Sequence, residues 1–175
     1  MADSDNIIEH LVNQFDSSWK LLREAIKYVP NDKWTMGIEP IKKSWAESKG
    51  RNIWYFSERV YHIIQTVEFY CADDPKSMKW GSRIGGIERK KESPEETAVR
   101  IKKEDMLEYL DEIKEKLELK LRSFSSDDLF TTDGFSEWQP SRLAKFLYTM
   151  RHSMWHIGEL SKALRDWDGE RVNWQ

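Results

Sequence analysis

The sequence holds one cysteine, Cys71, and therefore cannot form a disulfide within the chain. It also lacks an apolar run of the roughly 18 residues that a membrane-spanning helix needs. Its first residues, Met1-Ala-Asp-Ser-Asp-Asn, are acidic and are not followed by the apolar segment of a secretory signal. These absences lead us to expect a soluble, cytoplasmic protein with no membrane partner.

An excess of positive charge is also missing, since 28 lysines and arginines stand against 31 acidic residues and the net charge is −3. Proteins that bind nucleic acid draw much of their affinity from basic side chains that contact phosphates. The one basic cluster, residues 89–91, is followed at once by glutamates, which is typical of a solvated loop. We therefore expect no nucleic acid partner.

Several motifs of common catalytic sites are absent. There is no GxSxG turn, no HExxH helix, and no histidine with a glutamate three positions before it, as di-iron bundles require. Gly85 and Gly86 lack the spacing of a phosphate-binding loop. Cys71 falls on an apolar helical stripe, which favours core packing over nucleophilic catalysis.

Apolar residues recur at helical spacing in four segments, and we expect helices over residues 4–29, 51–72, 93–124 and 140–166. The first begins at residue 4 or 5. The third has the clearest start, because Ser93 can cap it, Pro94 suits the first helical position and Glu96 completes a capping box. The expected core positions are Ile8, Leu11, Phe15, Leu22, Ile26, Val29, Ile53, Phe56, Val60, Ile64, Val67, Cys71, Ile101, Leu110, Ile113, Leu117, Leu121, Phe124, Leu143, Phe146, Leu147, Met150, Ile157, Leu160 and Leu164.

The connections over residues 31–50 and 76–92 contain glycines and have no sustained period, and no segment alternates at the period of a strand. The pattern predicts a single all-α domain over residues 1–175. We expect a four-helix bundle with long loops between helices 1 and 2 and between helices 2 and 3.

The most informative feature is the pair His152 and His156, four residues apart in the last predicted helix. Such residues share a helix face, with Cβ atoms about 5–6 Å apart, so two imidazoles can converge on one metal ion. His62, in the second predicted helix, can complete a three-nitrogen site with an open position for water or substrate. Unrelated surface histidines are the alternative interpretation of this spacing. His10 is interpreted as a surface residue.

At about 100° per residue, the three histidines lie away from the apolar stripes of their helices. The faces that carry them hold polar and aromatic residues: Tyr55, Glu58, Thr66 and Phe69 beside His62, and Tyr148, Trp155, Glu159 and Ala163 beside the pair. A metal-centred pocket between the two faces explains this composition. Solvent exposure explains it too, and so does packing against a second subunit.

Five side chains on these faces are candidates for roles at such a site. Glu58 and Glu159 suit the orientation of ligands or general base catalysis, although solvated helix carboxylates are the alternative. Tyr55, Tyr148 and Trp155 can line a substrate pocket or can be packing residues. The nine tryptophans of the chain leave the same choice between packing and an aromatic-lined small-molecule pocket.

Three segments resemble the DinB-like superfamily of metal-dependent four-helix proteins, and the resemblance covers essentially the whole chain. They are Val60-Tyr-His-Ile-Ile-Gln-Thr-Val-Glu68, Arg151-His-Ser-Met-Trp-His-Ile-Gly-Glu-Leu160 and the ending Trp167-Asp-Gly-Glu-Arg-Val-Asn-Trp174. The resemblance implies a nickel or zinc site at one end of the bundle with His62, His152 and His156 as ligands, and a homodimer. It also implies a low-molecular-weight thiol, because characterised members include thiol-dependent S-transferases and a thiol-dependent isomerase. The glycine-containing loop after helix 2 and the tryptophan content depart from the family pattern.

The expected function is that of a divalent-metal-dependent enzyme of thiol-transferase or hydrolase type, acting on a small-molecule substrate. Three imidazoles suit zinc, nickel, copper and iron(II), so the ligands alone do not identify the metal. The alternative is a non-catalytic metal-binding or stress-associated bundle protein.

Overall fold

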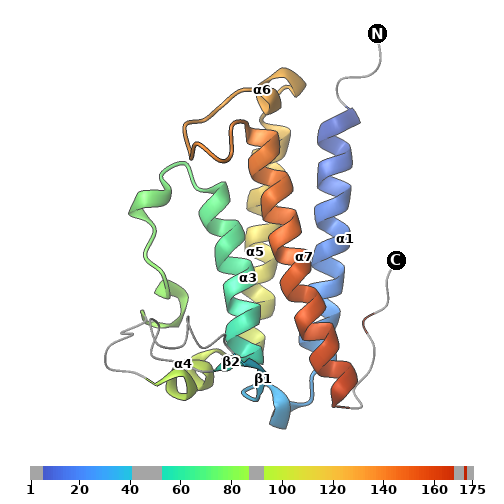
Figure 1. The fold of residues 1–175 in the computed structure, drawn as a ribbon, viewed down its shortest axis with the longest axis vertical. Coiled ribbons are helices and arrows are strands. Elements are labelled where there is room, and N and C mark those ends of the chain that lie inside the picture. Colours follow the sequence, from blue (N-terminus) through green and yellow to red (C-terminus); the bar gives the residue numbers. More distant parts are fainter. Residues whose placement is uncertain (1–5, 41–52, 87–92, 168–171, 173–175) are drawn as a thin grey trace.

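Four long helices dominate the described part of the protein. The computed structural model describes residues 6–40, 53–86, 93–167 and 172. The long helices are α1 (Asn6–Tyr28), α3 (Phe56–Cys71), α5 (Lys103–Arg122) and α7 (Arg142–Asp166). They run side by side (Figure 1), and both α1 and α3 pack against α5 and α7. The predicted all-α class is confirmed, because the protein is predominantly helical.

A small antiparallel sheet lies at one end of these helices, where no strand was predicted. After the 3₁₀ turn η1 (Asn31–Lys33), strand β1 (Gly37–Pro40) pairs with β2 (Ile53–Tyr55), with Trp54 opposite Glu39. The prediction of a helix from residue 51 is therefore wrong over residues 53–55, and residues 51 and 52 lie outside the described part. β-Branched and aromatic side chains favour an extended backbone here, and α3 begins only after Tyr55.

The third predicted helix is two helices, α4 (Pro94–Arg100) and α5, separated by a corner at residues 101–102. The predicted start is confirmed, because the Ser93 hydroxyl accepts a hydrogen bond from the Glu96 amide and the capping box is complete. The corner exists because Ile101 turns into the core with an extended backbone. Its carbonyl accepts a hydrogen bond of 2.6 Å from the Trp34 indole, which stabilises the corner.

The connections contain further short helices. The 3₁₀ turns η2 (Pro75–Ser77) and η3 (Ser82–Ile84) follow α3, and α6 (Ser126–Phe130) precedes α7. Ser141 caps α7 by accepting a hydrogen bond from the Ala144 amide. The predicted helix start at residue 4 or 5, residues 41–50 of the first connection and residues 87–92 of the second lie outside the described residues. Within the described part, every helix is too short or too polar to cross a lipid bilayer.

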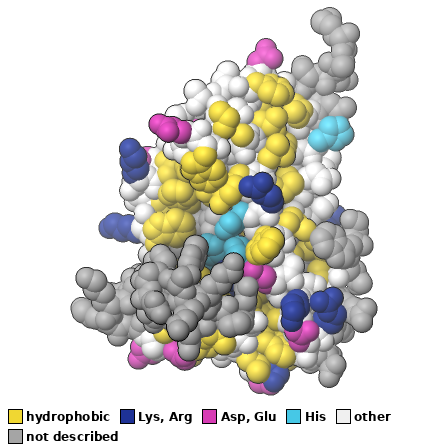
Figure 2. All heavy atoms as spheres, viewed as in Figure 1, with side chains coloured by type: hydrophobic (Ala, Val, Ile, Leu, Met, Phe, Trp, Pro, Cys, Tyr) yellow, Lys and Arg dark blue, Asp and Glu magenta, His cyan; other side chains and the backbone are white. Residues whose placement is uncertain are grey.

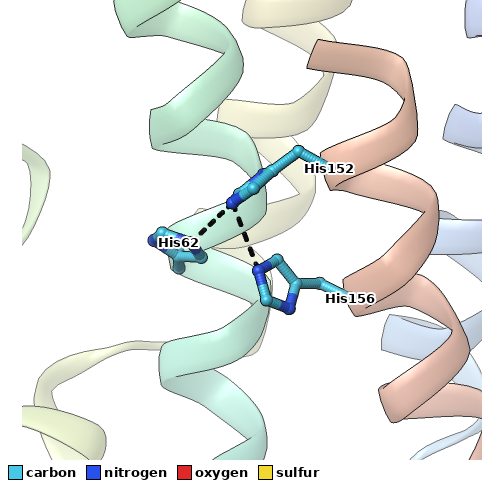
Figure 3. Close-up of side chains that lie close together, drawn as sticks. All are labelled: His62, His152 and His156. Atoms are coloured by element: carbon cyan, nitrogen blue, oxygen red, sulfur yellow. Dashed lines mark hydrogen bonds between the residues drawn. The ribbon is translucent and has the colours of Figure 1, made fainter. Parts of the chain in front are cut away.

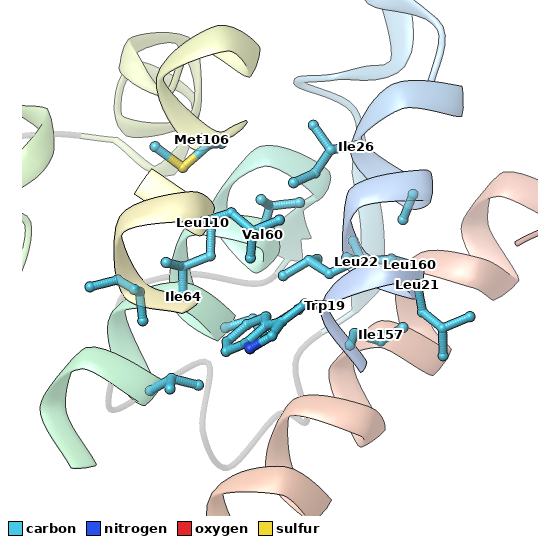
Figure 4. Packing of buried hydrophobic residues seen from close by; sticks show 14 of the residues in the cluster. Trp19, Leu21, Leu22, Ile26, Val60, Ile64, Met106, Leu110, Ile157 and Leu160 are labelled. Carbon is cyan, nitrogen blue, oxygen red and sulfur yellow. The ribbon is translucent and has the colours of Figure 1, made fainter. Parts of the chain in front are cut away.

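The core fills the space between the four long helices (Figure 4). Most of the predicted core positions are buried, among them Leu22, Val60, Leu110 and Leu160. Leu147 is exposed, because half of its surface reaches solvent. Ile53, Cys71, Phe124, Leu143 and Met150 are only partly buried. Each large apolar side chain that is fully buried contributes roughly 1.5–3 kcal/mol, and the four packed stripes therefore hold α3 and α7 at a fixed spacing.

Candidate metal centre

Three histidines meet between α3 and α7 (Figure 3). His62 comes from α3, whereas His152 and His156 come from successive turns of α7. Each offers one ring nitrogen, and the three nitrogens lie within 4.8 Å of one another. The alternative interpretation, in which these histidines are unrelated surface residues, is wrong. All three are half-buried and face each other.

The distances from His152 to the other two histidines match those between ligands around one ion. Nε2 of His152 lies 3.3 Å from Nε2 of His62 and 3.2 Å from Nε2 of His156. Ligands about 2.0–2.1 Å from a tetrahedral zinc ion are separated by about 3.3 Å. The three side chains therefore need little rearrangement to share an ion.

A carboxylate sets the proton position on one of the rings. Nδ1 of His156 lies 2.7 Å from Oε2 of Glu159, three residues further along α7. Because a carboxylate only accepts hydrogen bonds, this contact places a proton on Nδ1, and in the neutral ring the lone pair is then on Nε2. Metal-bound histidines usually donate their second ring nitrogen to such a partner. The arrangement thus suits a metal ligand.

His152 is held in the neutral form that binds metals. Burial lowers the pKa of its imidazole to about 4, and the neighbouring His156 and the Arg59 guanidinium act in the same direction. Among the described residues, its buried Nδ1 has no hydrogen-bond partner. The centre is nevertheless within reach of solvent, since Figure 2 shows histidine side chains at the surface with hydrophobic side chains around them.

Two residues at the centre were missed by the sequence analysis. The buried Arg59 side chain lies one turn before His62 on α3, and its Nε is 2.8 Å from Oε2 of Glu159. The guanidinium also lies over Trp54, 4.5 Å from the ring centroid, and the same indole is 6.0 Å from the His62 ring. The available signal was the three-residue spacing of Arg59 and His62, which places both on one face of a helix.

Two predicted site residues have other partners. Oε2 of Glu58 accepts a hydrogen bond of 3.3 Å from the Tyr55 amide and so caps the first turn of α3. The Tyr55 hydroxyl donates to a carboxylate oxygen of Glu95 on α4. Both contacts stabilise the junction of β2, α3 and α4, beside the turn that carries His62.

The two aromatic candidates on α7 lie next to the centre. The Tyr148 ring is 5.9 Å from the His152 ring and forms close contacts with Tyr70 and Trp138. Trp155 is 71% exposed, and its Nε1 donates a hydrogen bond of 2.7 Å to Oε1 of Glu159. Glu159 therefore contacts Trp155, His156 and Arg59 at once.

The remaining histidine and the cysteine fit the roles expected of them. His10 lies exposed on α1 and does not belong to the group of converging nitrogens. Burial raises the pKa of the Cys71 thiol to about 12, so this thiol stays protonated and is a poor nucleophile.

Comparisons with protein-family models, with curated proteins and with solved structures give no match. The functional argument therefore depends on the chemistry of the histidine centre.

Proposed function

We propose that this protein is a four-helix bundle of the DinB-like type that binds one divalent metal ion through His62, His152 and His156. The observation that carries the proposal is the convergence of three Nε2 atoms, with separations of 3.2 and 3.3 Å from His152 to its neighbours. Zinc and nickel are the metals proposed, because the resemblance implies them and neutral imidazoles suit both.

The function that fits such a centre best is that of a metal-dependent enzyme of thiol-transferase or hydrolase type. Three protein ligands leave a coordination position open, where a bound divalent ion acts as a Lewis acid and lowers the pKa of water or of a low-molecular-weight thiol. The half-buried setting supports this, because the histidines combine closeness to the core with access from solvent.

Side chains around the histidines are proposed to orient the ligands and to line the open coordination position. Glu159 orients the His156 ring. Glu159 is also proposed as a general base, and in that role it would have to give up one of its present hydrogen bonds. Glu58 is a second candidate base, one turn before His62. Tyr148 and Trp155 are proposed to contact a small-molecule substrate, and Tyr55 to support them from the junction with α4.

The second candidate function is a structural metal site in a non-catalytic protein. It is favoured by one observation, that the ligands come from two different helices and a bound ion would join α3 to α7.

The resemblance also implies a homodimer. The exposed Leu147 and Trp155 on α7 are the side chains we would test first for a subunit contact.

The first experiment is elemental analysis of protein purified without a histidine tag, with wild type beside His152→Ala. We expect about one equivalent of zinc or nickel per chain in the wild type and its loss in the variant. Wild-type protein that stays metal-free after incubation with both ions would sink the proposal. If the wild type binds metal and His152→Ala does not, the metal-loaded wild type is next screened with thiol substrates. Absence of turnover in that screen would favour the structural site.

A further inference from the structure

The Glu159 carboxylate lies at the meeting point of a ligand and a buried cation. Its Oε2 is 2.7 Å from Nδ1 of His156 and 2.8 Å from Nε of Arg59. The side chain of Glu159 is 17% exposed and that of Arg59 only 5%. Buried charges of this kind are stable only when they are paired, and removal of one partner leaves the other uncompensated. The position of the carboxylate thus depends on Arg59.

The Arg59 side chain is itself fixed. Its guanidinium packs on the Trp54 indole, which also lies against the His62 ring. Arg59 and His62 leave α3 one turn apart, just as His156 and Glu159 leave α7 three residues apart. The ion pair therefore joins the same two helices that provide the histidines, immediately beside them.

We propose that Arg59 is a positioning residue of the metal centre, which acts through Glu159 to keep His156 with its proton on Nδ1 and its Nε2 lone pair directed at the ion. The inference rests on the proposed metal site. Without Arg59, the half-buried carboxylate gains by turning toward solvent, and His156 then loses the acceptor that fixes its ring and its tautomer. Partners of ligands in this position typically change metal affinity by about 10–100-fold.

The test is a double-mutant cycle on metal affinity. Arg59→Met, Glu159→Gln and the double variant are titrated with Co²⁺, followed by its visible spectrum, and with Zn²⁺ in competition with a chelator. We expect Arg59→Met to bind both ions about 10–100-fold more weakly. Because Arg59 acts through Glu159, the double variant should bind no more weakly than Glu159→Gln alone. Arg59→Lys, which keeps the charge, should recover part of the affinity.

Arg83→Met is the matched control. Arg83 pairs with Glu112 at 2.5 Å and lies over the Tyr109 ring at 4.9 Å, so it shares the carboxylate and aromatic partners of Arg59. Its side chain is more exposed, at 38% against 5%, and it contacts none of the described residues of the histidine centre. Its substitution should leave metal affinity unchanged.

Circular dichroism and urea unfolding of each metal-free variant show whether it is folded. If Arg59→Met alone does not fold, the double variant, which removes both charges, is measured in its place.

A metal-free measurement separates this inference from the proposed function. Long-range ¹H–¹⁵N correlation spectra report which ring nitrogen of His156 carries the proton. We expect Nδ1–H in the wild type and a shift toward Nε2–H in Arg59→Met and in Glu159→Gln. Unchanged metal affinity in Arg59→Met, full additivity in the cycle, or an unchanged tautomer overturns the inference. Wild-type protein that binds no metal overturns the proposed function, while the tautomer still decides whether Arg59 controls His156.

Discussion

An imidazole must be neutral to bind a metal, and the surroundings of His152 favour that state. Burial is the main cause, and the adjacent His156 and Arg59 add to it. Protons would therefore compete weakly with a metal for this imidazole near neutral pH. The same property makes the metal-free protein sensitive to acid, because the folded state resists protonation of a group that the unfolded chain protonates readily.

We expect the metal-free wild type to lose stability as the pH falls from about 6.5, the usual pKa of histidine, to about 4, its pKa in the folded protein. Above this window both states leave His152 neutral, and its contribution is constant. Within it, the unfolded state binds more protons, so the free energy of unfolding decreases. Urea unfolding in the presence of a chelator at pH 7, 5.5 and 4.5 measures the effect.

The comparison for this prediction is His152→Gln, which cannot titrate at this position. Carboxylates elsewhere in the chain affect both proteins alike, so the difference between their free energies of unfolding isolates the histidine. It should shift in favour of the variant as the pH falls. Parallel pH profiles for the two proteins would show that burial does not oppose the charge on His152.

At the scale of helices, the sequence predicted the elements whose signals are repeated over several turns. The apolar stripes of α1, α3, α5 and α7 identified most of the core, and the Ser93 capping box located the start of α4. The helical period also placed His62, His152 and His156 away from those stripes, which is where the structure brings them together. These features depend on local spacing, which a sequence contains in full.

The features that sequence reasoning missed depend on contacts between distant residues. Strand β2 is three residues long and exists through pairing with β1, so its period cannot be recognised. The corner at Ile101 depends on Trp34, 67 positions earlier, which donates to its carbonyl. Arg59 gains its role from Glu159, a hundred residues later on another helix. Helical spacing suggested Glu159 as a candidate site residue but could not identify Arg59 as its partner.

The corner between α4 and α5 gives a prediction about stability. Trp34→Phe keeps an aromatic side chain but leaves the buried Ile101 carbonyl without its donor, which should lower the free energy of unfolding by about 1–3 kcal/mol. Trp138→Phe is the matched control, because Trp138 is 59% exposed and its substitution should change stability by no more than about 0.5 kcal/mol. Urea unfolding of both variants measures these changes in the free energy of unfolding. Equal effects would mean that the indole hydrogen bond does not stabilise the corner.

For the whole molecule, the important property of the centre is that its proposed ligands belong to two helices that are far apart in the sequence. His62 lies 90 positions before His152, so an unfolded chain cannot hold the three imidazoles in place without closing a long loop. A metal should therefore bind the folded state far better than the unfolded state. Binding and folding are then linked, whether the site is catalytic or structural.

This linkage predicts a thermal shift. At a free metal concentration 100 times the dissociation constant, binding stabilises the folded state by about 2.7 kcal/mol, which for a chain of this size raises the melting temperature by roughly 5–10 °C. The measurement is differential scanning calorimetry of the wild type with and without Zn²⁺ or Ni²⁺. His62→Ala should lose the shift, since only the pair on α7 remains. His10→Ala, which removes the exposed histidine of α1, should keep it. An equal shift in His62→Ala would place the bound metal elsewhere on the protein and contradict a site that joins α3 to α7.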